Sequence, residues 1–439
     1  MTGAVNRVRY ECVKAKSLLS KQIVADSWFH VNRSLNGYRG CEHGCVYCDG
    51  MSESYHVDDF FTHIRVKENA PEVLRRELKK IGFTADSELE SETLFKFLDQ
   101  DDAANLSRRL PRKQVIGVCG GVSDGYQQAE REHKVTRGNL EVLRDFGLPV
   151  FVLTKSNLVL RDLDILKEIH ERAFANVTFT VTLNDEETKK VFEPKSSSTA
   201  ERFDALKEVR KAGLFGGVMA VPIIPGIGDS YDNIRGLAKE AKQAGAESIV
   251  FGGLTIKPGR QKEYFLSVVR NRFPEYLELL RRIYSNDDKY GHPDYTKKPV
   301  SVMVRGHQVC KELGMRDRSV RHRIPGEYDS NNNVLGVLLD IVFYQTYALG
   351  LPWNVSGPFQ ELAMKLEGGV DDLTQLRKDG LLRERLRASD QMVSMIEEIM
   401  DHGTCKVLGE TEARLSAAES QGGQVFTAWT KVDSPDVGS

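Results

Sequence analysis

The stretch NGYRGCEHGCVYCDGMSESYH, residues 36–56, places three cysteines within eight positions. Cys41, Cys45 and Cys48 follow the pattern C-x3-C-x2-C, whereas the other four of the seven cysteines are scattered. An odd number of cysteines without regular spacing argues against a disulfide framework. Three thiolates at these separations can bind one metal centre if the backbone wraps around it, and the glycines of this loop ease such wrapping.

Two kinds of metal centre fit the triplet. A four-iron cluster usually takes four protein cysteines, so three cysteines leave one iron open to bind and activate another molecule. A zinc site would need a fourth ligand, which His43 or His56 could supply, since Cys3His sites are common. The position of the triplet in the fold helps to decide between them.

Downstream of the triplet, short apolar segments alternate with helical patterns. The segments are rich in Val, Ile, Phe and Thr and end in turn-forming or polar residues, which is typical of buried strands. They cover residues 114–121, 149–156, 176–183, 216–226 and 248–257. Amphipathic patterns at 130–147 and 198–213 predict two of the helices between them. Such alternation indicates βαβ units with a parallel sheet, as an α/β barrel or a doubly wound sheet.

The cysteine loop precedes this series and completes it. Residues 31–38 predict a first strand, and residues 68–82 predict a helix after the loop, which gives six βα units. The cysteines then lie just beyond the C-terminal end of the first strand. Ligands bind at that end in parallel α/β architectures, so this placement favours the open cluster.

The chain of 439 residues is long enough for one large α/β domain and an appendage. Residues 1–30 are expected to form an N-terminal extension. The core is expected to span 31–262, with an acidic and then basic insertion at 85–113. The strand pattern stops after the core, and residues 263–408 predict a mainly helical C-terminal appendage. Residues 409–439 are expected to form a disordered tail.

Charge and hydropathy give few hints about partners. The 61 basic and 63 acidic residues nearly cancel, so the overall charge does not indicate a nucleic-acid or membrane partner. Residues 303–326 concentrate basic side chains that could contact phosphates, but interspersed acids and the lack of stacking aromatics favour a solvated helix face. Lys257, Arg260 and Lys262 could meet an anionic substrate or simply cover a loop. No stretch approaches the roughly 20 apolar residues of a membrane span, and no apolar signal segment is seen, so we expect a cytoplasmic protein.

Tyr47 stands directly before the last cysteine of the triplet. With this aromatic residue, the motif resembles the signature of the radical S-adenosylmethionine superfamily. The wider stretch NGYRGCEHGCVYC, followed in order by GVSDGYQQAE, VLTKSNLVLRDLD, FEPKSSSTAERFDAL and VPIIPGIGD, is similar to the spore photoproduct lyase-like (DNA repair photolyase-like) branch. The resemblance runs from about residue 30 to residue 265. It implies a partial (β/α)6 TIM-type barrel with a mainly helical C-terminal appendage.

The resemblance also implies an enzyme with two cofactors. Cys41, Cys45 and Cys48 would hold three irons of a [4Fe–4S] cluster, and the amino and carboxylate groups of S-adenosylmethionine would chelate the fourth. One electron, from a donor such as a flavodoxin or ferredoxin, would split the sulfonium bond. The resulting 5′-deoxyadenosyl radical would abstract hydrogen from an unidentified substrate.

The remaining cofactor contacts implied by the resemblance come from strand ends. Tyr47 would lie against the adenine, and the backbone at Gly120 and Gly121 would approach the methionine amino group. Lys155 and Ser156 would pair with the carboxylate and a ribose hydroxyl. The other implied contacts are Ser123, Asp124, Thr180, Thr182, Glu193 and Arg202.

The sequence departs from this branch at two positions. Spore photoproduct lyases carry a hydrogen-donor cysteine where this chain has Gly121, and a tyrosine where it has Asp49. Cys119 is a candidate substitute donor, or a buried cysteine that acts as a small hydrophobe. The resemblance therefore implies the cofactor chemistry but not the substrate. A nucleic-acid lesion lyase and a non-catalytic metal-binding interaction module remain alternatives.

Overall fold

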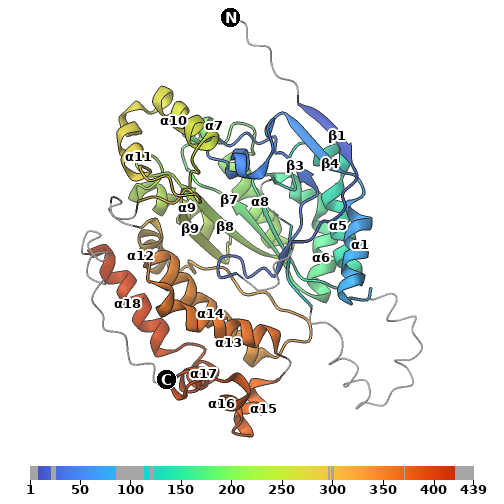
Figure 1. The fold of residues 1–439 in the computed structure, drawn as a ribbon, viewed down its shortest axis with the longest axis vertical. Helices are drawn as coiled ribbons and strands as arrows, with labels where there is room; N and C mark the ends of the chain where they lie inside the picture. Colours follow the sequence, from blue (N-terminus) through green and yellow to red (C-terminus); the bar gives the residue numbers. More distant parts are fainter. Residues whose placement is uncertain are drawn as a thin grey trace, which may run out of the picture.

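A six-stranded parallel sheet forms the centre of the fold (Figure 1). The computed structural model describes residues 8–20, 26–85, 113–118, 123–294, 297, 301–369 and 371–420. The strands, in spatial order, are β2 (Arg33–Ser34), β5 (Ile116–Val118), β6 (Val150–Thr154), β7 (Ala175–Thr180), β8 (Phe215–Ile223) and β9 (Ser248–Gly253). With β2 and β9 at its two edges, the sheet is a partial (β/α)6 barrel, and the predicted fold class is confirmed.

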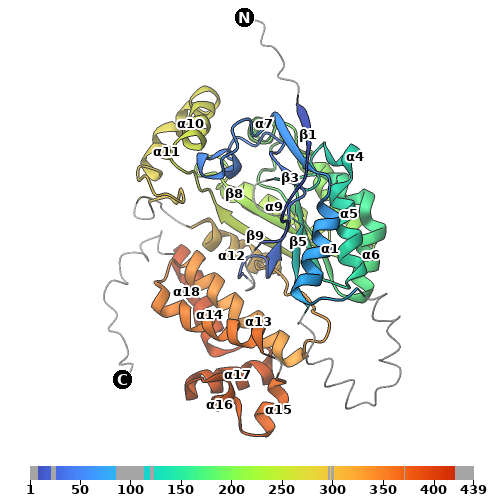
Figure 2. The ribbon, with the colours of Figure 1, turned by 45° about the vertical axis from the view of Figure 1, so that its right-hand side comes forward.

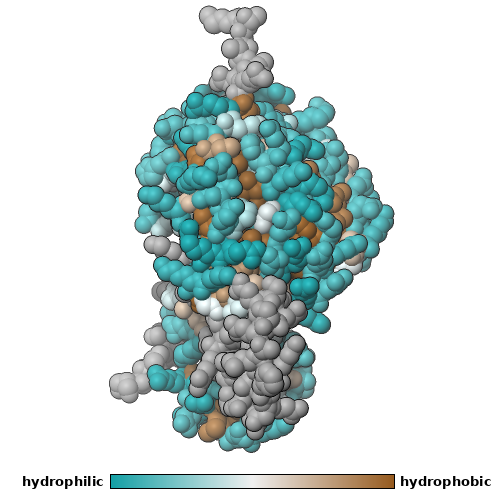
Figure 3. All heavy atoms as spheres, turned by 90° about the vertical axis from the view of Figure 1, so that its right-hand side faces the viewer, coloured by the Kyte–Doolittle hydropathy of each residue, from teal (hydrophilic) through white to brown (hydrophobic). Residues whose placement is uncertain are grey.

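Helices cover the outer face of this sheet. They are α1 (Ala70–Ile81), α5 (Val135–Asp145), α6 (Leu163–Arg172), α8 (Thr199–Lys211) and α9 (Tyr231–Gln243). The predicted cap of α8 is a capping box, in which Ser198 and Glu201 each bond the backbone of the other. The outward faces are polar, and Figure 3 shows a mostly hydrophilic surface over the described residues on the side of α1 and α5.

Alternation along β6 separates the core from the barrel interior. Val150 and Val152 pack with the covering helices, whereas Phe151 and Leu153 pack on the opposite face, with Phe29 and with residues of the C-terminal part such as Ile324. Successive strand side chains point to opposite faces, so this register fixes which residues face the lumen. Lys155 follows directly after the end of β6.

The helix predicted over 130–147 is in fact two helices. α4 (Glu130–His133) ends at Lys134, which has a φ of 51°, and α5 begins at Val135. The Glu130 carboxylate accepts hydrogen bonds from the backbone N–H groups of Thr136 and Arg137 at 2.9 and 3.2 Å. A buried acidic side chain thus stabilises a break that the apolar pattern does not reveal.

A second, smaller sheet lies beside the barrel. β1 (Arg9–Val13) pairs in parallel with β4 (His63–Lys67), and β3 (Tyr38–Arg39) pairs antiparallel with β4. The expected N-terminal extension therefore contributes a strand. β1 is mostly exposed, so it lacks the apolar alternation that predicts a strand from sequence.

The C-terminal part is helical, as predicted. Its elements include α10 (Arg260–Arg272), α11 (Leu277–Ile283), α12 (Val302–Leu313), α13 (Asp329–Val342), α14 (Trp353–Gly368), α15 (Leu373–Lys378), α16 (Leu382–Leu386), α17 (Asp390–His402) and α18 (Lys406–Ser420). α13 to α18 lie below the barrel and α12 lies between them and β9, whereas α10 and α11 lie at the upper left, near α7 (Figures 1 and 2). Within the described ranges, no helix combines the length and apolar character needed to cross a bilayer.

The appendage also packs on the edge of the barrel at β9. A Cβ atom at Gly306 of α12 would overlap the Phe251 ring, so glycine permits this close approach. Past α12, the Arg316 carbonyl accepts a hydrogen bond of 3.0 Å from Ile249 N–H. The segment after α12 therefore continues the sheet by one bridge.

One predicted segment needs correction, and others lie partly or wholly outside the described residues. The disordered tail predicted from residue 409 is wrong for residues 409–420, which belong to α18. Residues 421–439 lie outside the described part of the chain, as does the insertion predicted at 85–113 except for its two end residues.

The basic stretch 303–326 is not a solvated helix face. Three of its arginines follow α12 and pair with acids of the appendage. Arg316 pairs with Asp340 at 2.9 Å, and Arg318 pairs with Glu412 at 2.9 Å. The Arg321 side chain is buried and pairs with a glutamate at 3.2 Å. These partners are distant in sequence, which explains why local pattern suggested a solvated surface.

Acidification should destabilise the fold through His322. This buried ring packs edge-on against Phe174 at 4.9 Å, and burial, together with the charge of Arg321, lowers its pKa from 6.5 to about 3. The unfolded chain then binds a proton that the folded chain excludes, so stability falls as the pH drops from about 6.5 toward 3. We expect His322 to account for about 2 kcal/mol of the loss between pH 7.5 and pH 5.

The substitution His322→Phe retains an aromatic ring but cannot be protonated. Urea unfolding at pH 7.5 and pH 5 should show a smaller difference for this variant than for the wild type. An unchanged difference would contradict the assignment.

Candidate functional site

The carboxyl ends of the barrel strands open into a cavity of about 610 Å³, within the range of small-molecule sites. Cys41, Cys45 and Cys48 line one wall of it, and the ends of β6, β7, β8 and β9 contribute the others. The structure therefore brings the three predicted cluster ligands together at one cavity.

Hydrogen bonds from side chains that were not predicted as site residues hold the cysteine loop in place. The Gln127 amide accepts a hydrogen bond from Glu42 N–H at 3.0 Å and donates one to the Gly40 carbonyl at 3.1 Å. The buried Glu42 carboxylate accepts from Ala129 N–H at 2.7 Å and from the Tyr10 hydroxyl at 2.8 Å. These contacts join positions more than 30 residues apart, so no local motif could have revealed them.

The environment of the thiols is suited to a metal centre. Burial raises the pKa of Cys45 to about 12 and that of Cys48 to about 11, and it also raises the pKa of Cys41 well above its usual value. Without a bound cation the thiols stay protonated at neutral pH, since a coordinating metal is what stabilises the thiolate form in such a site.

The donor geometry disfavours the zinc alternative. Across the described ranges, no three His, Cys, Asp or Glu side chains converge on one ion. His43 is ion-paired with Asp124, and His56 is exposed and does not line the cavity. A four-iron cluster ligates each thiolate through a different iron, so its sulfurs need not converge on a single point.

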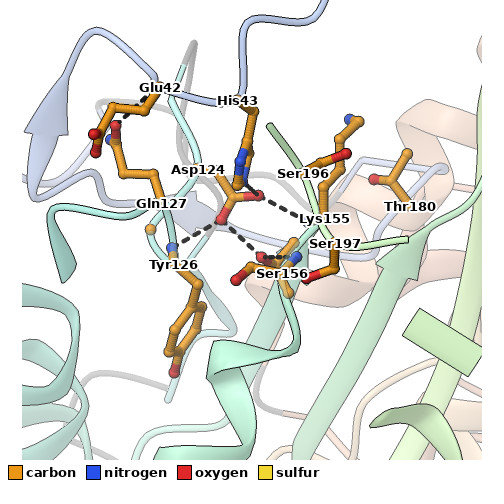
Figure 4. Close-up of polar contacts among 12 residues, drawn as sticks. Glu42, His43, Asp124, Tyr126, Gln127, Lys155, Ser156, Thr180, Ser196 and Ser197 are labelled. Atoms are coloured by element: carbon orange, nitrogen blue, oxygen red, sulfur yellow. Dashed lines mark hydrogen bonds and ion pairs between the residues drawn. The ribbon is translucent and has the colours of Figure 1, made fainter. Parts of the chain in front are cut away.

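Asp124 connects the cysteine loop to the end of β6 (Figure 4). One carboxylate oxygen is 3.1 Å from His43 Nε2 and accepts from Lys155 N–H at 2.8 Å. The other accepts from the Thr154 hydroxyl at 2.7 Å and from Tyr126 N–H at 2.8 Å. Burial alone would raise the pKa of Asp124, but His43 and these hydrogen bonds outweigh it and lower the pKa.

Tyr47 is held by a buried ion pair. Its hydroxyl donates to Glu193, which pairs with Arg202, and neither charged residue has exposed surface. Arg202 also donates to the Thr180 carbonyl at 2.7 Å, and the Thr182 hydroxyl donates to Glu193 at 3.2 Å. Burial alone would raise the pKa of Glu193, but Arg202 and Lys155 lower it to about 2. The pair therefore fixes the Tyr47 ring from behind the cavity wall.

Lys155 presents a cation to the cavity. Its ammonium lies 5.8 Å from the centre of the Tyr47 ring, and no hydrogen-bond or ion-pair partner for it occurs among the described residues. Burial would lower its pKa, but nearby Cys45 and Glu193 outweigh this and raise it. An unpaired ammonium at a cavity wall is suited to bind a carboxylate.

The predicted site residues fall into three groups. Those lining the cavity are Cys41, Cys45, Tyr47, Cys48, Ser123, Asp124, Lys155 and Thr180. Those outside the lining are Ser156, Thr182, Glu193 and Arg202, and Ser156 instead caps a turn by accepting from Leu158 N–H at 3.2 Å. Cys119, Gly120 and Gly121 lie outside the described residues, so the predicted hydrogen donor and glycine contacts are not described.

Breaking the ion pair behind Tyr47 should destabilise the protein strongly. In Glu193→Gln the guanidinium of Arg202 is left buried without a counter-charge, which costs about 3 kcal/mol or more of unfolding free energy. The double variant Glu193→Gln with Arg202→Met removes both charges and should recover part of that loss in urea unfolding. Equal stability of the single variant and the wild type would show that the pair does not matter.

Comparisons with known proteins agree with this geometry. Residues 35–238 match the Radical SAM superfamily. An uncharacterized protein of Mycobacterium tuberculosis is 27% identical over 256 residues, which cover 57% of this chain and 66% of the relative. An uncharacterized protein of Methanocaldococcus jannaschii is 27% identical over 252 residues, with 56% and 78% covered. The chain thus spans slightly less than two thirds of the mycobacterial relative.

A solved structure of spore photoproduct lyase complexed with dinucleoside spore photoproduct is also similar. Its TM-score is 0.46 at 16% identity, with 69% of this chain and 79% of that chain covered. At these values the likeness does not extend to branch or substrate. The match to the Radical SAM superfamily covers somewhat less than half of the chain, and it includes the three cysteines that line the cavity.

Proposed function

We propose that this protein is a radical S-adenosylmethionine enzyme acting on a substrate yet to be identified. The observation that carries the proposal is a cavity at the strand ends, with three cysteines on one wall and the ammonium of Lys155, which has no partner among the described residues, on another. When bound, a [4Fe–4S] cluster and S-adenosylmethionine supply reductive cleavage to methionine and a 5′-deoxyadenosyl radical for hydrogen abstraction.

We assign different residues of the cavity to binding and to positioning of the cofactors. Cys41, Cys45 and Cys48 would hold three irons, and Lys155 would pair with the carboxylate of the methionine moiety. The ring of Tyr47, fixed through Glu193, would flank the adenosine. The partly enclosed strand ends would limit the access of water to a reactive species.

The proposed reaction consumes one electron per cleavage, so it needs a reductant. A flavodoxin or ferredoxin of the cytoplasm fits this role, because such proteins deliver single electrons at low potential.

Replacing a proposed cluster ligand should abolish cofactor cleavage. After anaerobic reconstitution with iron and sulfide, Cys45→Ala should form no 5′-deoxyadenosine under reduction, because an iron loses its protein ligand. Product is measured by chromatography, and bound iron and sulfide by chemical analysis. Cys12 is exposed on β1, so Cys12→Ala is the matched control and should still bind the cluster and form the product. Cleavage by Cys45→Ala at the wild-type rate would contradict the proposal.

Removing the cavity cation should weaken cofactor binding without loss of the cluster. Lys155→Gln loses a charged hydrogen bond, so we expect affinity for S-adenosylmethionine to fall about tenfold to a hundredfold. Titration of the unreduced protein measures this effect. Lys190→Gln serves as the control, since this lysine is exposed on α7 (Glu186–Phe192). Unchanged affinity in Lys155→Gln would assign the carboxylate to another residue.

A further inference from the structure

The walls of the cavity differ in polarity from one side to the other. The side of the cysteine loop and the end of β6 carries the thiols, His43, Asp124 and Lys155. The remaining wall carries no charged side chain. Beside the Thr180 hydroxyl at the end of β7, it is formed by Phe29, Leu153, Val221, Pro222, Gly253, Leu254 and Thr255, of which only Thr255 has a polar side chain. We call the part of the cavity that this second wall lines the apolar chamber. None of its residues had been predicted as functional, because apolar strand residues are indistinguishable from core in sequence.

The charges that line the cavity are nearly all compensated within the protein. His43 pairs with Asp124 at 3.1 Å. Asp49 pairs with Lys257 at 2.9 Å and accepts from the Tyr55 hydroxyl at 2.6 Å. This leaves Lys155 as the one charged lining side chain without such a partner in the described chain, and the proposed cofactor carboxylate takes it. A second anion would find no counter-charge in the lining.

The basic residues that could have met an anionic substrate are also engaged. Besides Lys257, Arg260 pairs with Asp58 at 3.3 Å and Lys262 with Asp287 at 3.2 Å. Arg316, Arg318 and Arg321 pair with acids of the appendage and do not line the cavity. Residues 119–122, outside the described ranges, read Cys-Gly-Gly-Val and so carry no charge.

Close packing behind the apolar chamber holds its surface in place. A Cβ atom at Gly252 would lie only 2.8 Å from a Val221 methyl group and 3.0 Å from the Trp28 ring. The Trp28 ring in turn packs edge-on against Phe343 at 4.9 Å, and Phe29 lies 5.5 Å from Phe151. A wall supported in this way has little freedom to turn polar groups toward a ligand.

We propose that the substrate enters the cavity with an uncharged, apolar group, which the apolar chamber receives. This inference rests on the proposed function, since it assigns the polar side of the cavity to the cofactors. A phosphate or carboxylate placed in the chamber would lose its hydration and gain no partner, whereas a hydrocarbon or aromatic group would gain from burial. A nucleotide could react here only with its phosphates kept outside.

Probes of similar size and different charge test this assignment. The full chain is reconstituted anaerobically and saturated with S-adenosylhomocysteine, which carries the same carboxylate and adenosine but no sulfonium. The protein is then titrated, without reductant, with neutral p-cresol, anionic benzoate and cationic benzylamine, followed by NMR. We expect p-cresol to bind at least about tenfold more tightly than either ion.

A charge placed in the apolar chamber should invert this preference. In Val221→Asp, p-cresol should bind about tenfold more weakly and benzylamine about tenfold more tightly, a gain that an unfolded protein cannot show. Met364→Asp, on α14 and 46% exposed, is the control and should bind all three probes as the wild type does.

Three outcomes would overturn the inference: benzoate or benzylamine binding as tightly as p-cresol, no binding of any probe, or an unchanged preference in Val221→Asp. Cluster content and 5′-deoxyadenosine formation, measured on the same preparation, report separately on the proposed function. Should those fail, p-cresol and benzylamine compared on iron-free protein still test the chamber.

Discussion

The site depends on one buried carboxylate that joins two parts of the fold. Asp124 pairs with His43, which stands between two of the cluster cysteines, and accepts hydrogen bonds from Thr154 and Lys155 at the end of β6. The cysteine loop and the cavity cation are therefore held by the same group. Because its partners more than offset the cost of burial, the carboxylate stays ionised at neutral pH.

Further buried polar contacts brace the loop from other directions. Gln127 and Glu42 hold it to the start of α4, and Val46 N–H donates to the Phe192 carbonyl at 2.8 Å. The pair of Glu193 and Arg202 fixes Tyr47 from behind. Each such group is costly if left unpaired in the interior, so the network specifies one arrangement of the loop. Such rigidity would suit the proposed role of the three thiols as cluster ligands.

The parts predicted from sequence are those encoded by local pattern. The strands β5 to β9 are short runs of Val, Ile, Phe and Thr, and the triplet of cysteines is itself a local motif. What could not be predicted depends on contacts between distant residues. Tyr10 reaches Glu42, Arg318 reaches Glu412, and β1 pairs with β4 although its own sequence has no strand alternation. Asp124 was predicted as a cofactor contact, which stays a prediction; its hydrogen bonds to His43, Thr154 and the Lys155 backbone join separate elements and could not be predicted from local pattern.

The same reasoning changes the role of the C-terminal helices. They were expected to be an appendage to the barrel, yet α12 packs on β9 where the Gly306 backbone meets the Phe251 ring, and Phe343 packs against Trp28 behind the cavity. Val221 and Gly252, on β8 and β9, contact each other and Trp28 at that point. The wall that would receive the substrate is therefore built by barrel and appendage together. An open barrel cannot bury its edge strand alone, so the C-terminal helices that cover this edge also shape the apolar side of the cavity. Changes in these helices could therefore alter substrate preference while the cysteine loop stays the same.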